Sequence, residues 1–408
     1  MTALVHPGDA MSRGQRILHI ILLGALVGLG PFTIDLYLPA FPKVVDELST
    51  TDAAVQLTLT ATTVGFGLGQ LVVGPWSDRV GRRLPLLLAT AVHVAASIGV
   101  AVAPDVIWVG VFRVLQGIGA AGGGVVAMAM VRDLFSGHAL VRMLSRLALV
   151  TGLAPILAPL IGSQMLLLVD WRGIFVALAV YGFIAVVVSA FLIAETRPRG
   201  AHIPSATTTA RQRYRALFTD RVFIGVAVIG GMQFSGLFAY LSASSLLLQN
   251  VYGLSPQEFG LMFGINSLGL TVCSQLSSRL MRRIGPQWIL AAAIGIMLLA
   301  SVSIAITALL GGALIPILVA LFIMLSACGL AFPSVQVLAL AHHGSEAGTA
   351  ASLLGAVNFG LAGIISPLVG VLGISSALPM AAVMIGCHVV ANVVMWTVVR
   401  PRTVPPIE

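Results

Sequence analysis

Two charged residues lie inside long apolar stretches of the sequence, where charge is scarcest. Asp35 belongs to the stretch 17–42 and Arg113 to the stretch 106–131. A charge buried in apolar surroundings is costly, so each residue requires a partner or a water-filled cavity. If the two stretches are helices that end near Pro42 and Val106, both residues lie seven positions in, roughly 10 Å deep at about 1.5 Å per residue. We therefore expect Asp35 and Arg113 to face one cavity.

Within a membrane, a carboxylate in a wet cavity can take up a proton and release it when a positive charge approaches. This chemistry predicts a proton-coupling role for Asp35, with Arg113 organising water or tuning the carboxylate. Two structural alternatives stay open. Asp35 caps a helix end at the membrane interface near Tyr37 and Pro39, or Arg113 extends its side chain to that interface.

The composition indicates that the surrounding elements lie in lipid. The 408 residues are 58% hydrophobic and 9% charged, with a mean hydropathy of +1.03. A soluble domain carries about 25% charged residues, so this chain lacks the polar groups to cover a soluble surface. A length of 408 residues suits about a dozen helices of roughly 20 residues each.

Twelve apolar stretches are present, and none alternates with the period of a strand. They cover 17–42, 53–75, 84–103, 106–131, 143–169, 172–194, 222–248, 257–277, 287–310, 312–341, 348–373 and 377–399. Only helices or closed barrels span lipid. We therefore predict an all-α membrane protein with an N-terminal six-helix bundle at 1–194, a polar cytoplasmic linker at 195–221, and a C-terminal six-helix bundle at 222–408.

The basic residues predict the orientation. With a cytoplasmic N-terminus, all but three of the 22 Lys and Arg residues fall on the cytoplasmic side. The exceptions are Lys43 and Arg172 on the opposite side and Arg113 within a helix. Basic residues concentrate in cytoplasmic loops, so we expect both termini in the cytoplasm. This pattern explains the net charge of +8 without a nucleic-acid partner.

The segment 74–83 (GPWSDRVGRR) follows the second stretch and combines glycine, acid and arginine. Its key residues are Gly74, Asp78, Arg79, Gly81, Arg82 and Arg83. We interpret it as a tight glycine turn whose charges pair or cap helix ends and hold a cytoplasmic gate closed. The alternative is a basic cluster that only sets orientation. A copy lies 200 residues later at 277–283 (SSRLMRR), where Ser278 replaces the acid and Met281 the second glycine, so we expect a weaker second gate.

These motifs resemble those of the major facilitator superfamily, with 74–83 matching the signature between its second and third helices. The fourth stretch continues from Arg113 through Gln116, Gly117 and Gly119, as in the superfamily motif whose Arg is associated with proton transfer. The segment 152–162 (GLAPILAPLIG) is similar to the antiporter motif of drug exporters, which bends the fifth helix. Its motif residues are Gly152, Pro155, Pro159 and Gly162, while Ala158 and Ser163 stand where that motif has glycine.

With the segment 32–40 (FTIDLYLPA), the chain resembles the Bcr/CflA-type drug:proton antiporters, the bicyclomycin and chloramphenicol resistance exporters. Further matches are Arg132-Asp133, Glu195-Thr196 and 348–352 (GTAAS). The resemblance implies two pseudo-symmetric six-helix bundles and proton-coupled export of small amphipathic drugs across the bacterial inner membrane by alternating access. The alternative is an exporter of an endogenous metabolite, for example an amino-acid derivative. We expect the protein to be a monomer. We expect no cofactor, because the proton gradient drives transport.

Neutral polar and aromatic residues in the helices suit a permissive pocket for amphipathic compounds. The candidates are Phe32, Tyr37, Gln116, Gln233, Phe234, Tyr240, Asn266 and Asn358. Ordinary hydrogen bonding between helices is an equally good explanation for each polar member.

The absence of catalytic motifs argues against an enzyme. The sequence contains no DDxxD, HExxH or GxSxG motif and no ATP-binding loop. We also predict no metal site, because Cys273, Cys328 and Cys387 all lie in apolar stretches and act as small packing residues.

Overall fold

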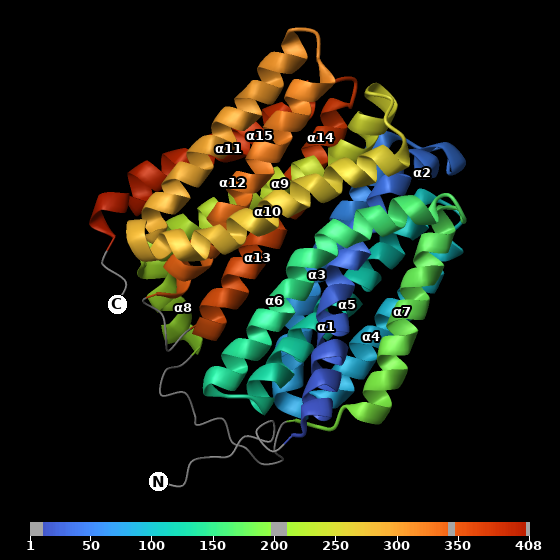
Figure 1. The fold of residues 1–408 in the computed structure, drawn as a ribbon, viewed down its shortest axis with the longest axis vertical. Coiled ribbons are helices and arrows are strands. Elements are labelled where there is room, and N and C mark those ends of the chain that lie inside the picture. The colour runs from blue at the N-terminus through green and yellow to red at the C-terminus, as the bar shows by residue number, and fades with distance from the viewer. Residues whose placement is uncertain (1–10, 197–209, 342–346, 405–408) are drawn as a thin grey trace. The chain divides into compact units, whose positions relative to one another are not determined.

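The computed structural model describes residues 11–196, 210–341 and 347–404, and nearly all of them are helical (Figure 1). Twelve of the described helical segments are long and apolar enough to cross a membrane. This confirms the predicted all-α class with twelve spans. Large apolar side chains such as Leu299 and Phe191 are exposed on the helices, as expected for surfaces that face lipid.

The chain folds into two units, each of which packs mainly against itself. The first comprises 1–37 and 61–204, and the second comprises 38–60 and 205–408. The domain bounds predicted from the sequence, 1–194, 195–221 and 222–408, stay predictions. Residues 197–209 of the predicted linker lie outside the described residues, and its last part forms the helix α8 (Ala210–Thr219) and the start of α9.

The first unit is a bundle of six long helices. They are α1 (Arg13–Asp35), the larger part of α3 (Asp52–Val80), α4 (Arg83–Ala101), α5 (Val106–Leu134), α6 (Gly137–Met165) and α7 (Trp171–Leu192). Side chains at helix starts accept the free backbone N–H groups: Ser12 with Gln15 forms a capping box on α1, and Asp105 and Asp170 cap α5 and α7. Leu23, Val126 and Leu147 belong to the core that joins α1, α5 and α6.

The second unit contains the remaining long helices and several short segments. They are η2 (Leu38–Ala40), α2 (Phe41–Glu47), α8, α9 (Arg221–Leu246), η3 (Leu247–Val251), α10 (Pro256–Ile284), α11 (Pro286–Leu309), α12 (Leu314–Leu340), α13 (Ala347–Ile365), α14 (Pro367–Leu372), α15 (Leu378–Val394), η4 (Met395–Val399) and η5 (Pro401–Thr403). Phe223, Leu290 and Val335 belong to the core that joins α9, α11 and α12.

The short segment η2 joins the second unit through hydrogen bonds to its backbone carbonyls. Ser245 Oγ donates to the Leu38 oxygen at 2.5 Å, and Gln249 Nε2 donates to the Pro39 oxygen at 3.1 Å. α1 ends at Asp35, Pro39 lies in η2, and Pro42 lies in the first turn of α2, where backbone N–H groups have no partner within the helix. The first span therefore has a non-α-helical segment, which the predicted continuous helix 17–42 did not include.

Candidate functional site

Arg113 is a fully buried charge in α5, seven residues after the helix begins at Val106 as predicted. Its Nη1 donates to the backbone oxygen of Thr33 on α1 and to Gln116 Oε1, both at 2.8 Å. The guanidinium carbon lies 5.1 Å from the ring centre of Tyr37 and 5.6 Å from that of Phe175. Two acceptors and two aromatic rings therefore hold the cation in place.

A chain of hydrogen bonds continues from Arg113 to α4. Gln116 Nε2 donates to Ser97 Oγ at 2.8 Å, and Ser97 donates to the His93 backbone oxygen at 2.8 Å. His93 Nε2 lies 3.4 Å from Ser97 Oγ, and His93 Nδ1 lies 3.4 Å from the backbone oxygen of Gln116. All these side chains are buried. The network fixes the orientation of Arg113 from two helices, and neither Ser97 nor His93 had a predicted functional role.

Asp35 is the last residue of α1, not an interior residue of a longer helix. Its side chain is only 6% exposed. The candidate span continues from Asp35 through η2 and α2 to Glu47. The helix end assumed at Pro42 was therefore wrong, and the depth of Asp35 in the membrane stays a prediction. Among the described residues no ion pair joins Asp35 to Arg113, and the structure links them instead through Thr33, two residues before Asp35. The two predicted coupling residues are therefore neighbours through the α1 backbone.

The predicted antiporter motif lies in α6, whose interior contains Pro155 and Pro159. Each proline removes one backbone hydrogen bond of the helix, which weakens it locally and favours a bend. A Cβ added at Gly162 would overlap the backbone oxygen of Leu36, the residue that follows Asp35. The glycine thus allows α6 to contact α1 where α1 ends. Gly152, the remaining motif residue, also lies in α6.

The predicted gate motif begins inside a helix. Gly74, Asp78 and Arg79 lie in the last turns of α3, and the turn itself consists of Gly81 and Arg82 before α4 begins at Arg83. Gly81 has φ of +101°, a backbone conformation that other residues adopt only with strain.

Arg82 is the centre of an ion-pair network within the first unit. Its Nη1 donates to Asp78 Oδ1 at 2.6 Å and to Ser77 Oγ at 2.9 Å, and its Nε donates to Asp133 Oδ2 at 2.8 Å. Burial lowers the pKa of Arg82, but the hydrogen bonds and charges of Asp133 and Asp78 outweigh it, so the pKa is raised above its usual value. Arg82 is therefore charged at every pH that a cell reaches.

Glu195, after the end of α7, completes this network. Its carboxylate accepts the backbone N–H groups of Arg82 at 2.8 Å and of Arg83 at 3.1 Å. Thr196 Oγ1 donates to Asp133 Oδ2 at 3.3 Å. In the sequence, Asp133 and Glu195 are visible only as family matches. Their positions at predicted helix ends do not specify which distant arginine they bind.

Three predicted cavity residues lie in the first unit. Tyr37 and Gln116 are buried against Arg113. The Phe32 ring makes an edge contact with Tyr181 at 6.0 Å between centres. Tyr37 and Gln116 therefore hold the cation in place.

In the second unit, α9 and α13 bring aromatic and amide groups together. The Phe234 ring lies 4.8 Å from that of Phe238 and 5.0 Å from that of Phe359. Gln233 Nε2 donates to the Cys328 oxygen at 3.2 Å. In the described part of the chain, Gln233 Oε1 and Asn358 Oδ1 are buried without a hydrogen-bond partner.

Tyr240 and Asn266, the last two predicted cavity residues, bond to each other. Asn266 Nδ2 donates to the Tyr240 hydroxyl at 3.1 Å, and both side chains are buried. The Tyr240 ring also stacks on Phe263, with 5.8 Å between centres. This pair connects α9 to α10, which matches the alternative of hydrogen bonding between helices. A role in substrate binding stays a prediction for all eight residues.

The family model of the Major Facilitator Superfamily matches residues 21–367. The chain belongs to this superfamily. It is a multi-pass membrane transporter of small molecules and not an enzyme.

Curated relatives cover nearly the whole chain. It is 36% identical to the uncharacterized MFS-type transporter YdgK of Bacillus subtilis, over 95% of this chain and 97% of that protein. It is 31% identical to a bicyclomycin resistance protein homolog of Haemophilus influenzae, over 91% and 94%. The multidrug resistance protein MdtL of Salmonella paratyphi B is 26% identical, over 93% and 95%. These relatives agree with the resemblance to the Bcr/CflA-type exporters.

Solved structures share the fold at low sequence identity. A bacterial homolog of the human lysosomal transporter Spinster, in an inward-facing and occupied conformation, matches with a TM-score of 0.78 and 16% identity, over 97% of this chain and 98% of that one. A D-xylose–proton symporter matches with a TM-score of 0.77 and 17% identity, over 96% and 99%. Both matches confirm the major facilitator fold.

Proposed function

We propose that this transporter exports small amphipathic drugs from the bacterial cytoplasm in exchange for protons, by alternating access. Asp35 binds a proton from outside as the substrate leaves and releases it inside when the transporter reopens. Arg113 supplies the positive charge that accompanies this exchange. The protein resides in the inner membrane as a monomer with both termini in the cytoplasm, and the proton gradient replaces any cofactor.

The observation that carries the proposal is the position of Arg113 relative to Asp35. A fully buried cation is expensive in a membrane protein and is kept where it has a function. Here it binds the backbone of Thr33, two residues before an almost buried carboxylate at the end of α1. A change in the charge of Asp35 therefore acts on a helix end that Arg113 and the α6 contact at Gly162 both hold.

The choice of substrate rests on relatives and on the second unit. Two relatives are named for resistance to bicyclomycin and to multiple drugs. The aromatic cluster at Phe234, with the free amide oxygens of Gln233 and Asn358, suits a compound with an apolar body and a few hydrogen-bond donors. We infer that the network of Arg82 stabilises the closed cytoplasmic gate.

The test is efflux from proteoliposomes under an imposed pH gradient, with bicyclomycin and chloramphenicol as probes. Asp35→Asn keeps the size of the side chain but removes its ability to exchange a proton. We expect gradient-driven efflux to be lost while the thermal shift caused by the bound drug is kept. The matched control is Asp46→Asn, which changes an exposed carboxylate on α2 and leaves efflux unchanged.

Two outcomes would overturn parts of the proposal. Full gradient-driven efflux by Asp35→Asn removes this residue from proton coupling. If neither drug is transported but a deletion strain accumulates an endogenous metabolite, such as an amino-acid derivative, the substrate class is that metabolite, and the same Asp35 comparison then tests coupling with it.

A further inference from the structure

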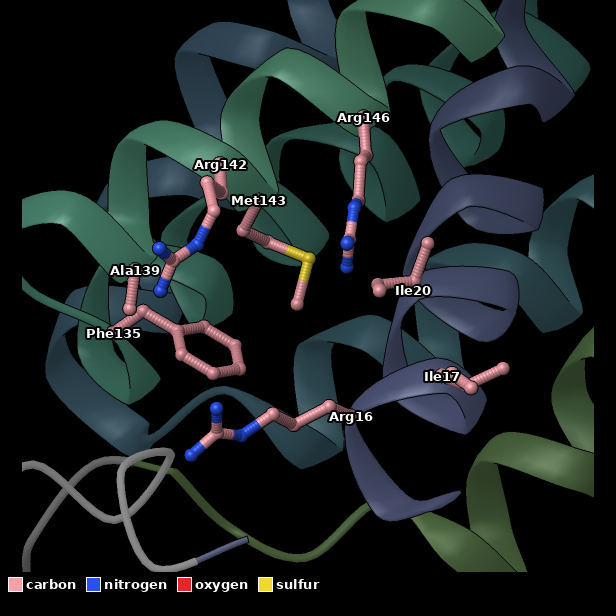
Figure 2. A pocket seen from close by; sticks show the side chains of 8 residues that line it. All are labelled: Arg16, Ile17, Ile20, Phe135, Ala139, Arg142, Met143 and Arg146. Atoms are coloured by element: carbon pink, nitrogen blue, oxygen red, sulfur yellow. The ribbon is translucent and has the colours of Figure 1, made fainter. Parts of the chain in front are cut away.

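A cavity of about 500 Å³ opens in the first unit beside the first turns of α1 and α6 (Figure 2). Its lining residues come from α1, from the connection after α5 and from α6. They are Arg16, Ile17, Ile20, Phe135, Ala139, Arg142, Met143 and Arg146. None of them belongs to the Asp35–Arg113 site or to the gate motif.

Three guanidinium groups give the cavity its charge. Arg142 and Arg146 lie one helical turn apart on α6, and Arg16 approaches from α1, so that all three side chains border the same space in Figure 2. None of the eight lining residues is acidic. Arg142 and Arg146 form no ion pair with any described residue. Planar guanidinium groups bind phosphate through paired hydrogen bonds, so the cavity suits a phosphate-bearing anion.

The rest of the lining is apolar. Ile17 and Ile20 of α1 line the cavity near Arg16, and Met143 of α6 lies between Arg142 and Arg146 (Figure 2). Ile17 is 46% exposed. One turn further along α1, Ile21 is 61% exposed. The span continues from there into the membrane. A free phosphate ion gains nothing from these apolar side chains. A ligand with a phosphate head and apolar tails contacts both the arginines and the apolar side chains.

We propose that this cavity binds the headgroup of an anionic phospholipid, with its acyl chains along the face of α1 that carries Ile17 and Ile21. The predicted orientation places the cavity at the cytoplasmic leaflet, whose anionic lipids attract basic groups near the membrane surface. This inference does not depend on the substrate or on proton coupling.

The test compares lipid binding by the full-length protein in detergent, measured by native mass spectrometry. Phosphatidylglycerol and phosphatidylcholine are the two probes. The double variant Arg142→Gln, Arg146→Gln removes two of the three guanidinium groups that line the cavity. We therefore expect a loss of affinity for phosphatidylglycerol on the order of 30-fold, because two charge-assisted contacts to the headgroup are lost, and little change for phosphatidylcholine.

The matched control is Arg215→Gln, Arg402→Gln, which removes two exposed charges that do not line the cavity. It should keep the wild-type preference for phosphatidylglycerol. Thermal unfolding of both double variants checks that they fold. Equal affinity of the wild type for both lipids, or equal losses in both double variants, overturns the proposal.

A second comparison separates a lipid from a free phosphate. Ile17→Asn removes part of the apolar lining and should weaken phosphatidylglycerol binding while leaving sn-glycerol 1-phosphate unaffected. If sn-glycerol 1-phosphate binds the wild type as tightly as the lipid does, the cavity binds a soluble phosphate compound and the lipid proposal is wrong.

Discussion

The two units of the chain bury different kinds of polar groups. Among the described residues, every buried charged side chain lies in the first unit, namely Asp35, Arg82 and Arg113. The buried polar side chains of the second unit include the neutral groups Gln233, Asn266 and Ser301. The helices are similar in length and apolarity, so the fold does not require this difference. The difference agrees with the roles proposed above, proton coupling in the first unit and substrate binding in the second.

The repeated motif shows the same contrast at closer range. In the first unit Arg82 is buried between two aspartates. In the second unit Arg282 is exposed near the end of α10, which continues to Ile284, and it forms no ion pair with a described residue. Ser277 donates to the Leu330 oxygen at 2.8 Å. Its counterpart Ser77 donates to the Gly74 oxygen at 2.8 Å and also accepts from Arg82 at 2.9 Å. Similar sequences therefore produce a buried network in one unit and a solvated basic helix end in the other.

The largest expected effect is the loss of the buried cation. Arg113→Gln removes the charge and leaves the Thr33 oxygen and Gln116 without their donor. We expect gradient-driven efflux to fall on the order of 100-fold, because hydrogen bonds to a charged group are each worth about 1.5–3 kcal/mol. Arg113→Lys keeps the charge but not the paired geometry and should be intermediate. The measurement is the initial rate of efflux in proteoliposomes.

Gln233→Met is the matched change in the second unit. It removes the hydrogen bond to the Cys328 oxygen and should alter the apparent KM for the drug. The ratio of efflux with and without a pH gradient should stay at its wild-type value. If Gln233→Met lowered this ratio to one, or if Arg113→Gln left it at the wild-type value, the assignment of different tasks to the two units would be wrong.

The next effect concerns Arg82 and Arg282, which occupy equivalent positions in the two copies of the repeated motif. Arg82→Gln removes hydrogen bonds to two carboxylates, and we expect the free energy of unfolding to fall by about 2 kcal/mol, since Asp78 is half exposed and solvent weakens its share. Arg282→Gln removes an exposed charge and should change it by less than about 0.5 kcal/mol. Thermal unfolding in detergent measures both. Equal changes would mean that the two copies are equivalent.

A smaller difference is expected at the glycines that end the two helices. Gly81 and Gly285 have φ of +101° and +86°, so alanine at either position costs about 1–3 kcal/mol in backbone strain. A Cβ at Gly81 would also lie 2.6 Å from Glu195 Oε2, which binds the turn, whereas at Gly285 its near neighbours belong to the flexible Gln287 side chain. Gly81→Ala should therefore lower the melting temperature more than Gly285→Ala does. A larger fall in melting temperature for Gly285→Ala would show that the Glu195 side chain moves away from the new Cβ at no cost in stability.

The smallest effect is expected for a neutral pair of the second unit. Tyr240→Phe removes the acceptor of the Asn266 hydrogen bond and should lower the free energy of unfolding by about 1 kcal/mol. Efflux under a pH gradient should continue, since no charge changes. A loss of proton dependence in Tyr240→Phe would place coupling groups in the second unit.

Sequence reasoning found the twelve spans because a span needs a long apolar run, and such runs are visible without tertiary contacts. It missed the break after Asp35, because Pro39 and Pro42 lie within an apolar stretch. It also ended the second helix near residue 75, although α3 continues through the polar motif to Val80. The contacts of Arg82 with Asp133 and Glu195 join residues far apart in the sequence. No local pattern specifies such pairs, so the roles of these partners came only from the structure.

The attachment of Glu195 and Thr196 has a mechanical consequence. These two residues are the first of the predicted linker and the last described ones before residue 210. Glu195 binds the turn between α3 and α4, and Thr196 binds Asp133 beside it. Any tension along the chain from the second unit is therefore transmitted first to the gate motif. A reporter domain inserted before Glu195 would separate this anchor from α7, whereas insertion after Thr196 leaves the anchor whole.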